Sequence, residues 1–342
     1  MKIVILSLFF TLNIFAKTFN IALLSWSDSV AGMVSMREGV IEETDKINIL
    51  AKETSKNLIN LKVFIAGDGQ EGMERQKKQI LNLIDKDIDL FIIQPSDSAI
   101  LSEPLKIINR KKIPIVTYDG YILDVEITSH LSSNNYQLGF LNGEFVANSF
   151  DSEKEIKLIM IEYPHVPQTV KRADGFLDAL EHYRQKYKII ASYKSVNPTE
   201  GKKVAEKILK NFPKRDSIDV IFAINDSGSY PILEKLIEAK RDEIFFASID
   251  GEKKMVKLIE DNSILKIDSA QFCKALGAIA LKTSYQILNN ERVPKYIKLP
   301  VFPITKETLH LYKGWSSDIP KEFIKPWSSD FPKWSGDLIY QK

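Results

Sequence analysis

Hydrophobic residues of the 342-residue chain gather in short runs that alternate with longer amphipathic stretches. Most runs are continuously apolar rather than alternating, which is typical of parallel strands covered on both faces. The runs that we predict to be strands are FNIALLS (19–25), LKVFIA (61–66), DLFIIQ (89–94), IPIVTYD (113–119), IKLIMIE (156–162), YKIIASY (187–193), DVIFAIND (219–226) and EIFFASID (243–250).

The amphipathic stretches between these runs predict helices, several of which begin at turn residues such as Asn197-Pro198-Thr199. The predicted helices cover residues 73–86, 99–111, 168–185, 199–211, 229–240 and 252–261. Alternating strands and helices indicate an α/β fold with parallel sheets. The chain is longer than one simple doubly wound sheet requires, and the alternation breaks at residues 120–135. We therefore expect two similar lobes with the ligand chemistry between them.

The first sixteen residues follow a different pattern. Met1-Lys2 gives a positive start, residues 3–15 are apolar, and Ala16 is a small residue before Lys17. This pattern predicts a signal peptide over residues 1–16, because the apolar run is shorter than the about 20 residues that span a bilayer. No cysteine follows, so a lipoprotein anchor is not expected. We expect an exported, soluble protein that begins near Lys17.

Charge and composition exclude several classes of function. The 47 Lys and Arg residues nearly balance 45 Asp and Glu residues and are spread among them, which argues against nucleic-acid binding. Cys273 is the single cysteine, and the four histidines lack metal-binding spacing, so we expect neither a disulfide nor a metal site. No nucleophile elbow or phosphate-binding loop occurs, so we expect neither an enzyme nor a cofactor.

One glycine motif raises the alternative of a dinucleotide enzyme. Gly67, Gly69 and Gly72 spell G-x-G-x-x-G between a predicted strand and a predicted helix. A dinucleotide site needs this motif after the first strand of the unit, whereas here it follows the second, and Asp68 and Glu71 would repel a pyrophosphate. We therefore expect a simple turn, with Gly72 opening the helix.

The C-terminal segment, residues 312–342, lacks the strand–helix alternation and holds three of the four tryptophans. The pattern WSSD-x-P-K occurs in it twice, at 315–321 and 327–333. One interpretation is an irregular strap whose Trp rings pack against a lobe. The other is a docking surface for a partner protein, because exposed Trp residues often anchor interfaces.

Polar or aromatic residues follow the ends of several predicted strands, namely Trp26, Gln94, Ser96, Asp119, Asn225-Asp226 and Asp250. The carboxyl ends of parallel strands lie along one edge of a sheet, so these side chains are expected on a common rim. Carboxylates, amides and aromatic faces are the groups that hold a polyhydroxylated ligand. For single residues the alternative is a helix cap or a turn, as Asp119-Gly120 and Asp250-Gly251 illustrate.

In its order of segments from about residue 19 to 305, the chain resembles the periplasmic sugar-binding proteins of ABC transporters, specifically the ribose/galactose-type group. The segments that carry the resemblance are 21–39, 91–101, 113–120, 129–146, 170–176 (VKRADGF), 220–233, 246–251 and 269–280. The resemblance implies the type I periplasmic binding protein fold, also found in LacI-like effector domains. In this fold two Rossmann-like lobes, joined by a three-crossover hinge, close on a ligand in the cleft between them.

The resemblance also assigns ligand-binding roles, to Asp119, Arg172, Asn225, Asp250 and Gln271. Ribose binders usually have an arginine after the aspartate of the fourth strand, where this chain has Gly120. Their first loop commonly offers two stacking phenylalanines, and here only Trp26 could replace one. The resemblance therefore implies a small sugar-like ligand without identifying it.

The expected domains are an N-terminal lobe (17–133 plus 272–300), a C-terminal lobe (134–271 plus 301–311) and a C-terminal extension (312–342). We expect a periplasmic monomer that delivers its ligand to the permease subunits of an ABC transporter. The alternative is a sensory receptor that presents the ligand to a membrane histidine kinase. A LacI-type repressor is not expected, because a signal peptide rather than a helix-turn-helix precedes the first strand.

Overall fold

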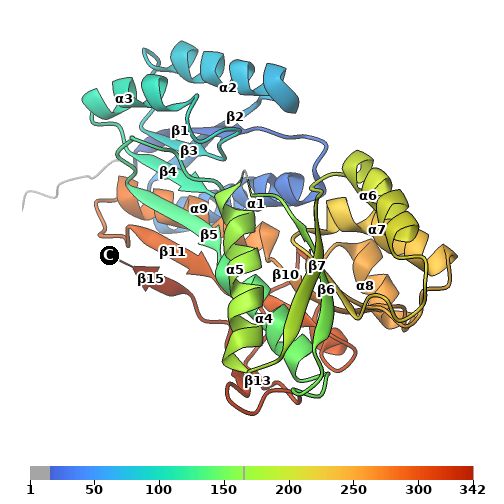
Figure 1. Cartoon of the computed structure of the whole chain (residues 1–342). Helices are drawn as coiled ribbons and strands as arrows, with labels where there is room; N and C mark the ends of the chain where they lie inside the picture. The colour runs from blue at the N-terminus through green and yellow to red at the C-terminus, as the bar shows by residue number, and fades with distance from the viewer. Residues whose placement is uncertain (1–15, 165, 342) are drawn as a thin grey trace, which may run out of the picture.

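The computed structural model describes residues 16–164 and 166–341, so most of the predicted signal peptide lies outside the described residues. The described chain forms two α/β lobes, each with a mostly parallel sheet between helices (Figure 1). This arrangement confirms the predicted fold class. Within the described ranges, no helix is both long enough and apolar enough to cross a membrane.

The sheet of the first lobe has the strand order β15-β11-β5-β4-β3-β1-β2. Its strands are β1 (Thr18–Ser25), β2 (Leu58–Ile65), β3 (Leu90–Ile93), β4 (Ile115–Tyr118), β5 (Ser129–Ser133), β11 (Tyr296–Leu299) and β15 (Ile339–Gln341). Neighbouring strands run parallel, except that β15 runs antiparallel to β11. The carboxyl ends of β1, β3 and β4 therefore lie along one edge.

Helices cover both faces of this sheet because its strands are apolar on both sides. In β1, Ile21 and Leu23 pack toward α1 (Ala31–Thr54) and α9 (Cys273–Leu288), whereas Ala22 and Leu24 face the opposite side. There they meet α2 (Gly69–Leu83) and α3 (Ser102–Arg110). The continuous apolar runs seen in the sequence are thus explained by burial on two faces.

The sheet of the second lobe has the strand order β12-β10-β9-β8-β6-β7, with β12 antiparallel to β10 and the other pairs parallel. Its strands are β6 (Ile156–Glu162), β7 (Tyr187–Lys194), β8 (Val220–Ala223), β9 (Phe245–Asp250), β10 (Leu265–Ala270) and β12 (Phe302–Ile304). One face packs against α4 (Asn135–Ala147) and α5 (Pro167–His182). The other packs against α6 (Pro198–Asn211), α7 (Asp226–Glu238) and α8 (Lys253–Glu260).

The chain passes between the lobes from β5 to α4, from β10 to α9 and from β11 to β12. The first passage lies at the end of the predicted break (120–135), where β5 is followed by α4. These two elements were missed, because β5 has few apolar residues and α4 is buried on much of its circumference. Buried residues around a whole helix leave no amphipathic period to detect.

The C-terminal extension packs against the second lobe and then returns to the first. After the short 3-10 helix η1 (Leu309–Leu311), it forms a small hairpin of β13 (Phe323–Ile324) and β14 (Lys333–Trp334). The Trp334 ring is buried 5.3 Å from the ring of Phe302, and its indole nitrogen donates to the oxygen of Val301 at 2.8 Å. β15 then joins the first sheet beside β11, which makes a fourth passage between the lobes (Figure 1).

A buried ion pair fastens the extension to α4. Lys325 Nζ donates to Oε2 of Glu144, and the two side chains are 4% and 0% exposed. Ser328 Oγ donates to Oε1 of the same carboxylate at 2.6 Å, as does Tyr183 Oη at 2.9 Å. These contacts, with the buried Trp334, correspond to the strap interpretation of this segment.

The glycine motif makes a tight turn from β2 into α2. The helix begins at Gly69, three residues before Gly72, which was predicted to open it. Gly67 (φ 87°) and Gly69 (φ 67°) reverse the chain within the first half of the motif. A Cβ atom at Gly72 would lie 1.9 Å from the carbonyl oxygen of Gly67. Close approach of backbone therefore explains the third glycine without a bound phosphate.

Candidate functional site

Arg172 and Asp250 form a buried ion pair at the carboxyl end of the second sheet. Arg172 lies on α5, and its Nη1 donates to Oδ1 of Asp250 at 3.0 Å and to the oxygen of Ile224 at 2.8 Å. Its Nε donates to Oδ1 of Asn135 at 2.9 Å. These three bonds fix the guanidinium plane, so that it lies beside the end of β9 in one orientation.

Gln271, directly after β10, joins this group. Its Nε2 donates to the same Oδ1 of Asp250 at 2.8 Å, and its backbone nitrogen donates to the oxygen of Asp250 at 3.2 Å. Burial raises the pKa of Asp250, while Arg172 and Gln271 act in the opposite direction. Neither neighbour donates to Oδ2 of Asp250, which leaves that oxygen available to another donor.

Asp119 faces this group from the first lobe. It follows β4, its backbone nitrogen donates to Leu131, and its carbonyl oxygen accepts from Nε2 of Gln168 on α5 at 3.2 Å. That bond joins the two lobes. Burial raises the pKa of Asp119 to about 6. The guanidinium of Arg172 lowers this pKa, and the carboxylate of Asp250 raises it further. The two aspartates and the arginine thus lie within electrostatic range of each other across the lobe boundary.

Both aspartates have unusual backbone conformations. Asp119 has φ of 65°, Asp250 has φ of 134°, and Gly251 has φ of 77°. A non-glycine residue at positive φ costs about 1–3 kcal/mol, and such residues concentrate at functional sites. The strand ends that carry the two carboxylates are therefore turned away from the ordinary extended path.

Two buried carboxyl groups behind Asp250 support this turn. Asp226 Oδ2 accepts from the backbone nitrogen of Glu252 at 2.8 Å, and Asp268 Oδ1 accepts from that of Gly251 at 3.1 Å. Ser248 Oγ donates to Oδ1 of Asp226 at 2.6 Å. Burial and the charge of Asp250 raise the pKa of Asp268 to about 8. Asp268 was not predicted from the sequence, because β10 (LKIDSA) mixes apolar and polar residues and was not recognised as a strand.

Asn225 occupies the N-cap position of α7. Its Oδ1 accepts from the backbone nitrogen of Gly228 at 3.3 Å, and its Nδ2 donates to the oxygen of Val196 at 2.9 Å. Gln94, another strand-end residue, is fully buried and its Oε1 accepts from Ser25 Oγ at 2.9 Å. The alternative of a structural cap or buried bond therefore accounts for the observed contacts of both side chains.

Trp26 is half-buried and follows β1 on the same sheet edge as Asp119. The next residue, Ser27, is buried, and its Oγ accepts from the backbone nitrogen of Val30 at 3.0 Å. Arg37 from α1 donates to the oxygen of Ser27 at 2.7 Å. These bonds fix the loop that carries Trp26.

Trp315 of the C-terminal extension also reaches the group, which the sequence analysis did not foresee. Its Nε1 donates to the carbonyl oxygen of Asp250 at 2.7 Å. The extension lacks periodicity, so nothing in the sequence indicated which of its tryptophans would meet this strand end. Among the described residues, no group of three or more His, Cys, Asp or Glu is arranged to hold a metal ion.

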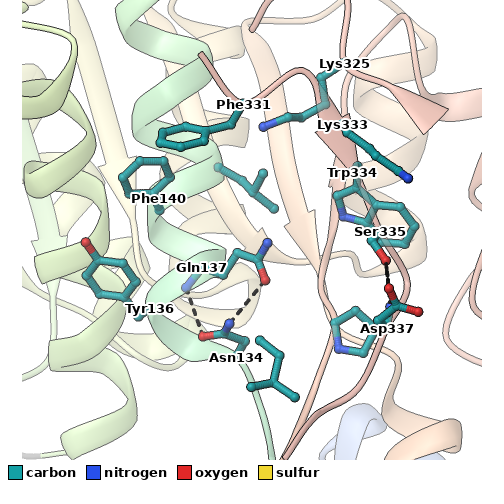
Figure 2. A pocket seen from close by; sticks show the side chains of 13 residues that line it. Asn134, Tyr136, Gln137, Phe140, Lys325, Phe331, Lys333, Trp334, Ser335 and Asp337 are labelled. Atoms are coloured by element: carbon teal, nitrogen blue, oxygen red, sulfur yellow. Dashed lines mark hydrogen bonds between the residues drawn. The ribbon is translucent and has the colours of Figure 1, made fainter. Parts of the chain in front are cut away.

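A separate pocket of about 480 Å³ lies where the extension meets α4 (Figure 2). Tyr136 and Phe140 line it from α4, and Phe331 and Trp334 line it from the extension. None of the six residues predicted to bind a ligand lines this pocket. Figure 2 shows Asn134 and Gln137 bonded to each other at its edge. The pocket is therefore distinct from the group around Asp250.

Two α/β lobes that present facing polar groups across a multi-stranded hinge define a two-lobed solute-binding protein. The chain belongs to the periplasmic binding protein family, because the model of the periplasmic binding protein domain matches residues 21–292. The resemblance seen in the sequence is thereby confirmed. The ribose import binding protein of Bacillus subtilis is 26% identical over 270 residues, which cover 78% of this chain and 81% of that protein.

Solved structures show the same fold. A solute-binding protein of an ABC transporter from Actinobacillus succinogenes, with bound D-allose, superposes with a TM-score of 0.72 at 22% identity. That match covers 86% of this chain and all of the other. The fructose-binding periplasmic domain of a hybrid two-component system gives a TM-score of 0.71 at 20% identity, over 85% of this chain and 92% of the other.

Proposed function

We propose that the chain is an exported solute-binding protein that captures a small sugar or sugar-like molecule and delivers it to an ABC permease. One observation carries the proposal: Arg172 and Asp250 of the second lobe face Asp119 of the first lobe in a buried, polar environment. The match to ribose import binding proteins supports a sugar as ligand and an ABC importer as partner.

The chemistry of these side chains suits hydroxyl groups. The free oxygen of Asp250 and the carboxylate of Asp119 accept hydrogen bonds from sugar hydroxyls, while Arg172 and Gln271 donate to ring and hydroxyl oxygens. Trp26 offers an aromatic face for the C–H surface of a sugar ring. In this proposal Asn225 contributes the amide proton that its bond to Val196 leaves free.

Lobe closure follows from the placement of the two aspartates. A ligand bonded to Asp119 on one lobe and to Asp250 on the other binds the closed state better than the open state, so it shifts the population toward closure. In this proposal the bond from Gln168 to the oxygen of Asp119, which joins the two lobes, contributes to the closed state. A closed protein then presents both lobes together to the permease.

The remaining expectations form part of the same proposal. Residues 1–16 act as a signal peptide that directs a monomeric protein to the periplasm, where it binds no nucleic acid and catalyses no reaction. The lobes comprise 17–133 plus 272–300 and 134–271 plus 301–311, followed by the C-terminal extension. The family relatives, which are periplasmic binding proteins, support this interpretation.

A calorimetric titration tests the proposal. Residues 17–342 are titrated with D-ribose, D-allose, D-galactose and myo-inositol, with amino acids as comparison ligands, and melting temperatures are recorded alongside. We expect one sugar or polyol to bind and to raise the melting temperature, because a ligand that binds only the folded state stabilises it. Binding of amino acids but of no sugar or polyol would contradict the proposal.

A sensory receptor is the second candidate. The similarity in fold to the periplasmic domain of a two-component system shows that this architecture also serves signalling. The altered first loop and the extension, which go beyond a ribose-type binder, motivate it. Adjacent genes for a permease and an ATPase would favour transport, whereas an adjacent gene for a sensor kinase would favour signalling.

A further inference from the structure

Trp315 stands at the junction of the C-terminal extension and both lobes. Its indole Nε1 donates to the carbonyl oxygen of Asp250 at 2.7 Å, although 65 residues separate the two in sequence. The ring packs against the core of the second lobe and also against the core of the first. A single side chain of the extension thus bridges the two lobes beside a proposed ligand-binding carboxylate.

The carbonyl group that accepts this bond belongs to a strained residue. Asp250 has φ of 134° and is followed by Gly251 at 77°, so its peptide plane is rotated out of the ordinary strand path. Tyr312, also from the extension, donates its hydroxyl to the next carbonyl oxygen, that of Gly251, at 3.2 Å. Two aromatic donors of the extension therefore hold two successive carbonyl groups at this turn.

These bonds add to those from Gln271 and Asp268 that hold the backbone from which the Asp250 side chain projects. A strained conformation persists only where surrounding contacts over-determine it. The backbone conformation of Asp250 sets the direction in which its own side chain projects. The carboxylate therefore contacts Arg172 and Gln271 only while the backbone keeps its rotated conformation. Loss of the indole donor would remove one of three bonds to the peptide between Asp250 and Gly251. The bond from the Gln271 nitrogen to the Asp250 oxygen and the bond from the Gly251 nitrogen to Asp268 would remain, so the peptide and the carboxylate would be held less firmly.

The far end of the Trp315 ring reaches the first lobe. Its Cη2 atom lies 3.9 Å from the position that a Cβ atom would take at Gly32, and Cys273 Sγ lies 3.5 Å from the same point. Gly32 lies in the first turn of α1, behind the loop that carries Trp26. The ring therefore extends from the peptide of Asp250 in the second lobe to the start of α1 in the first.

The second copy of the WSSD pattern supplies an internal comparison. Trp327 stacks edge-on against Phe145 of α4, with ring centroids 5.0 Å apart. It belongs to the contact between the extension and the second lobe, together with Ser328 and Lys325. Identical four-residue sequences therefore occupy different places, and Trp327 serves as a matched control for Trp315.

We propose that Trp315 is a positioning residue for the ligand site, which it serves by fixing the Asp250 peptide and by walling the site against Gly32. The ligand part of this inference rests on the proposed function. The positioning part concerns the ligand-free protein and can be measured without any sugar.

The test compares the W315F and W327F variants of residues 17–342. Amide hydrogen exchange of the ligand-free proteins is followed at Gly251 and Glu252, and the affinities for D-ribose, D-allose and myo-inositol are measured by calorimetry. Phenylalanine keeps a ring and removes the indole donor. Loss of one hydrogen bond to a buried carbonyl group is expected to speed exchange about tenfold and to weaken binding about five- to twentyfold. W327F should change both quantities less than about twofold.

Each outcome bears on a separate claim. Unchanged exchange at Gly251 and Glu252 in W315F overturns the positioning role, whatever the sugars do. Faster exchange with unaltered affinity for a sugar that the wild type binds overturns the role in ligand binding. Faster exchange in a protein whose wild type binds none of the three probes upholds the positioning role and counts against the proposed function instead.

A spectroscopic readout separates this role from a general loss of packing. Sugar binding by the wild type should change tryptophan emission, because Trp315 lies beside the site and Trp26 is proposed to contact the sugar. The change should be retained in W327F and reduced in W315F at equal saturation with the sugar. A change of the same size in all three proteins would contradict the placement of Trp315 at the ligand.

Discussion

Arg172 donates one hydrogen bond to Asp250 and a second, from the same Nη1 atom, to the backbone oxygen of Ile224. The arginine therefore bonds to the end of β8 and to the end of β9 at the same time. Asp119 approaches from the other lobe, and the charge of Arg172 lowers its pKa against the effect of burial. One cation thus acts on two carboxylates that come from different lobes.

Replacing Arg172 by alanine should abolish this balance. The buried aspartates would lose their cation, and we expect stability to fall by about 3–5 kcal/mol, as when one partner of a buried pair is removed. Sugar affinity, measured by calorimetry, should fall at least about tenfold, since each charge-assisted bond contributes about 1.5–3 kcal/mol.

Arg241 offers the control for that experiment, because it forms an even more buried pair with Glu243 in the same lobe. R241A should lower stability without weakening sugar binding. Equal losses of affinity in both variants would show that Arg172 acts only through the stability of the lobe.

Stability of the ligand-free protein should depend on pH through buried carboxyl groups. The pKa values of Asp119 and Asp268 are raised to about 6 and about 8, above the about 3.9 of an unfolded aspartate. Between the unfolded pKa and the folded pKa of each aspartate, the folded chain binds more protons than the unfolded chain. The free energy of unfolding therefore falls as pH rises from about 4 to about 8.

Melting temperatures measured across this range check the sign. Asparagine mimics the protonated acid, so D268N should flatten the slope between pH 6 and 8. D119N should flatten it between pH 4 and 6. A wild-type melting temperature that rises from pH 6 to 8, or an unaltered slope in D268N, would contradict the assignment.

Removing the Lys325 charge should loosen the extension from the second lobe. K325M would leave the carboxylate of Glu144, which is 0% exposed, without its cation. We expect a loss of about 3–5 kcal/mol in urea unfolding. Lys333 pairs with Glu322 at the surface, both side chains being more than 60% exposed, and K333M should stay within about 1 kcal/mol of wild type. Similar losses in both variants would refute the buried anchor.

Substitutions in the glycine motif should separate close packing from backbone conformation. In G72A the new methyl group would meet the carbonyl oxygen of Gly67, and we expect a loss of about 1–3 kcal/mol. In G69A nothing lies within 4 Å, so only the left-handed conformation costs energy, about 1–2 kcal/mol. Urea unfolding measures both. Sugar affinity should be unchanged in both variants. A loss of affinity in either variant would indicate that the glycine motif contributes to ligand binding.

The sequence indicated Asp119 and Asp250, the two carboxylates proposed to bind the ligand, because each ends a largely apolar run. Asp119 follows β4 and Asp250 ends β9, so strand position alone placed them on the rims of their sheets. Their facing arrangement across the lobes came from the resemblance. Strand position could not distinguish Asn225, whose side chain caps α7, from a residue free to meet a ligand.

Other parts of the structure left no periodic signal. Helix α4 is buried on several sides, and strand β10 places Asp268 and Ser269 in the interior, so neither shows a simple alternation. Trp315 was hidden for a different reason. Trp315 lies in an irregular segment and donates to a backbone oxygen. Every residue has the same backbone oxygen, so the sequence does not indicate which residue accepts the bond.

The return of β15 to the first sheet determines which lobe carries the end of the chain. β1 and β15 belong to the same sheet, so a fluorophore attached behind Gln341 would move with the first lobe. A second fluorophore on α6, where Lys207 is exposed, would move with the other lobe. Energy transfer between the two would then report opening and closing directly, and the protein could serve as an optical sensor for its solute without an insertion into either lobe.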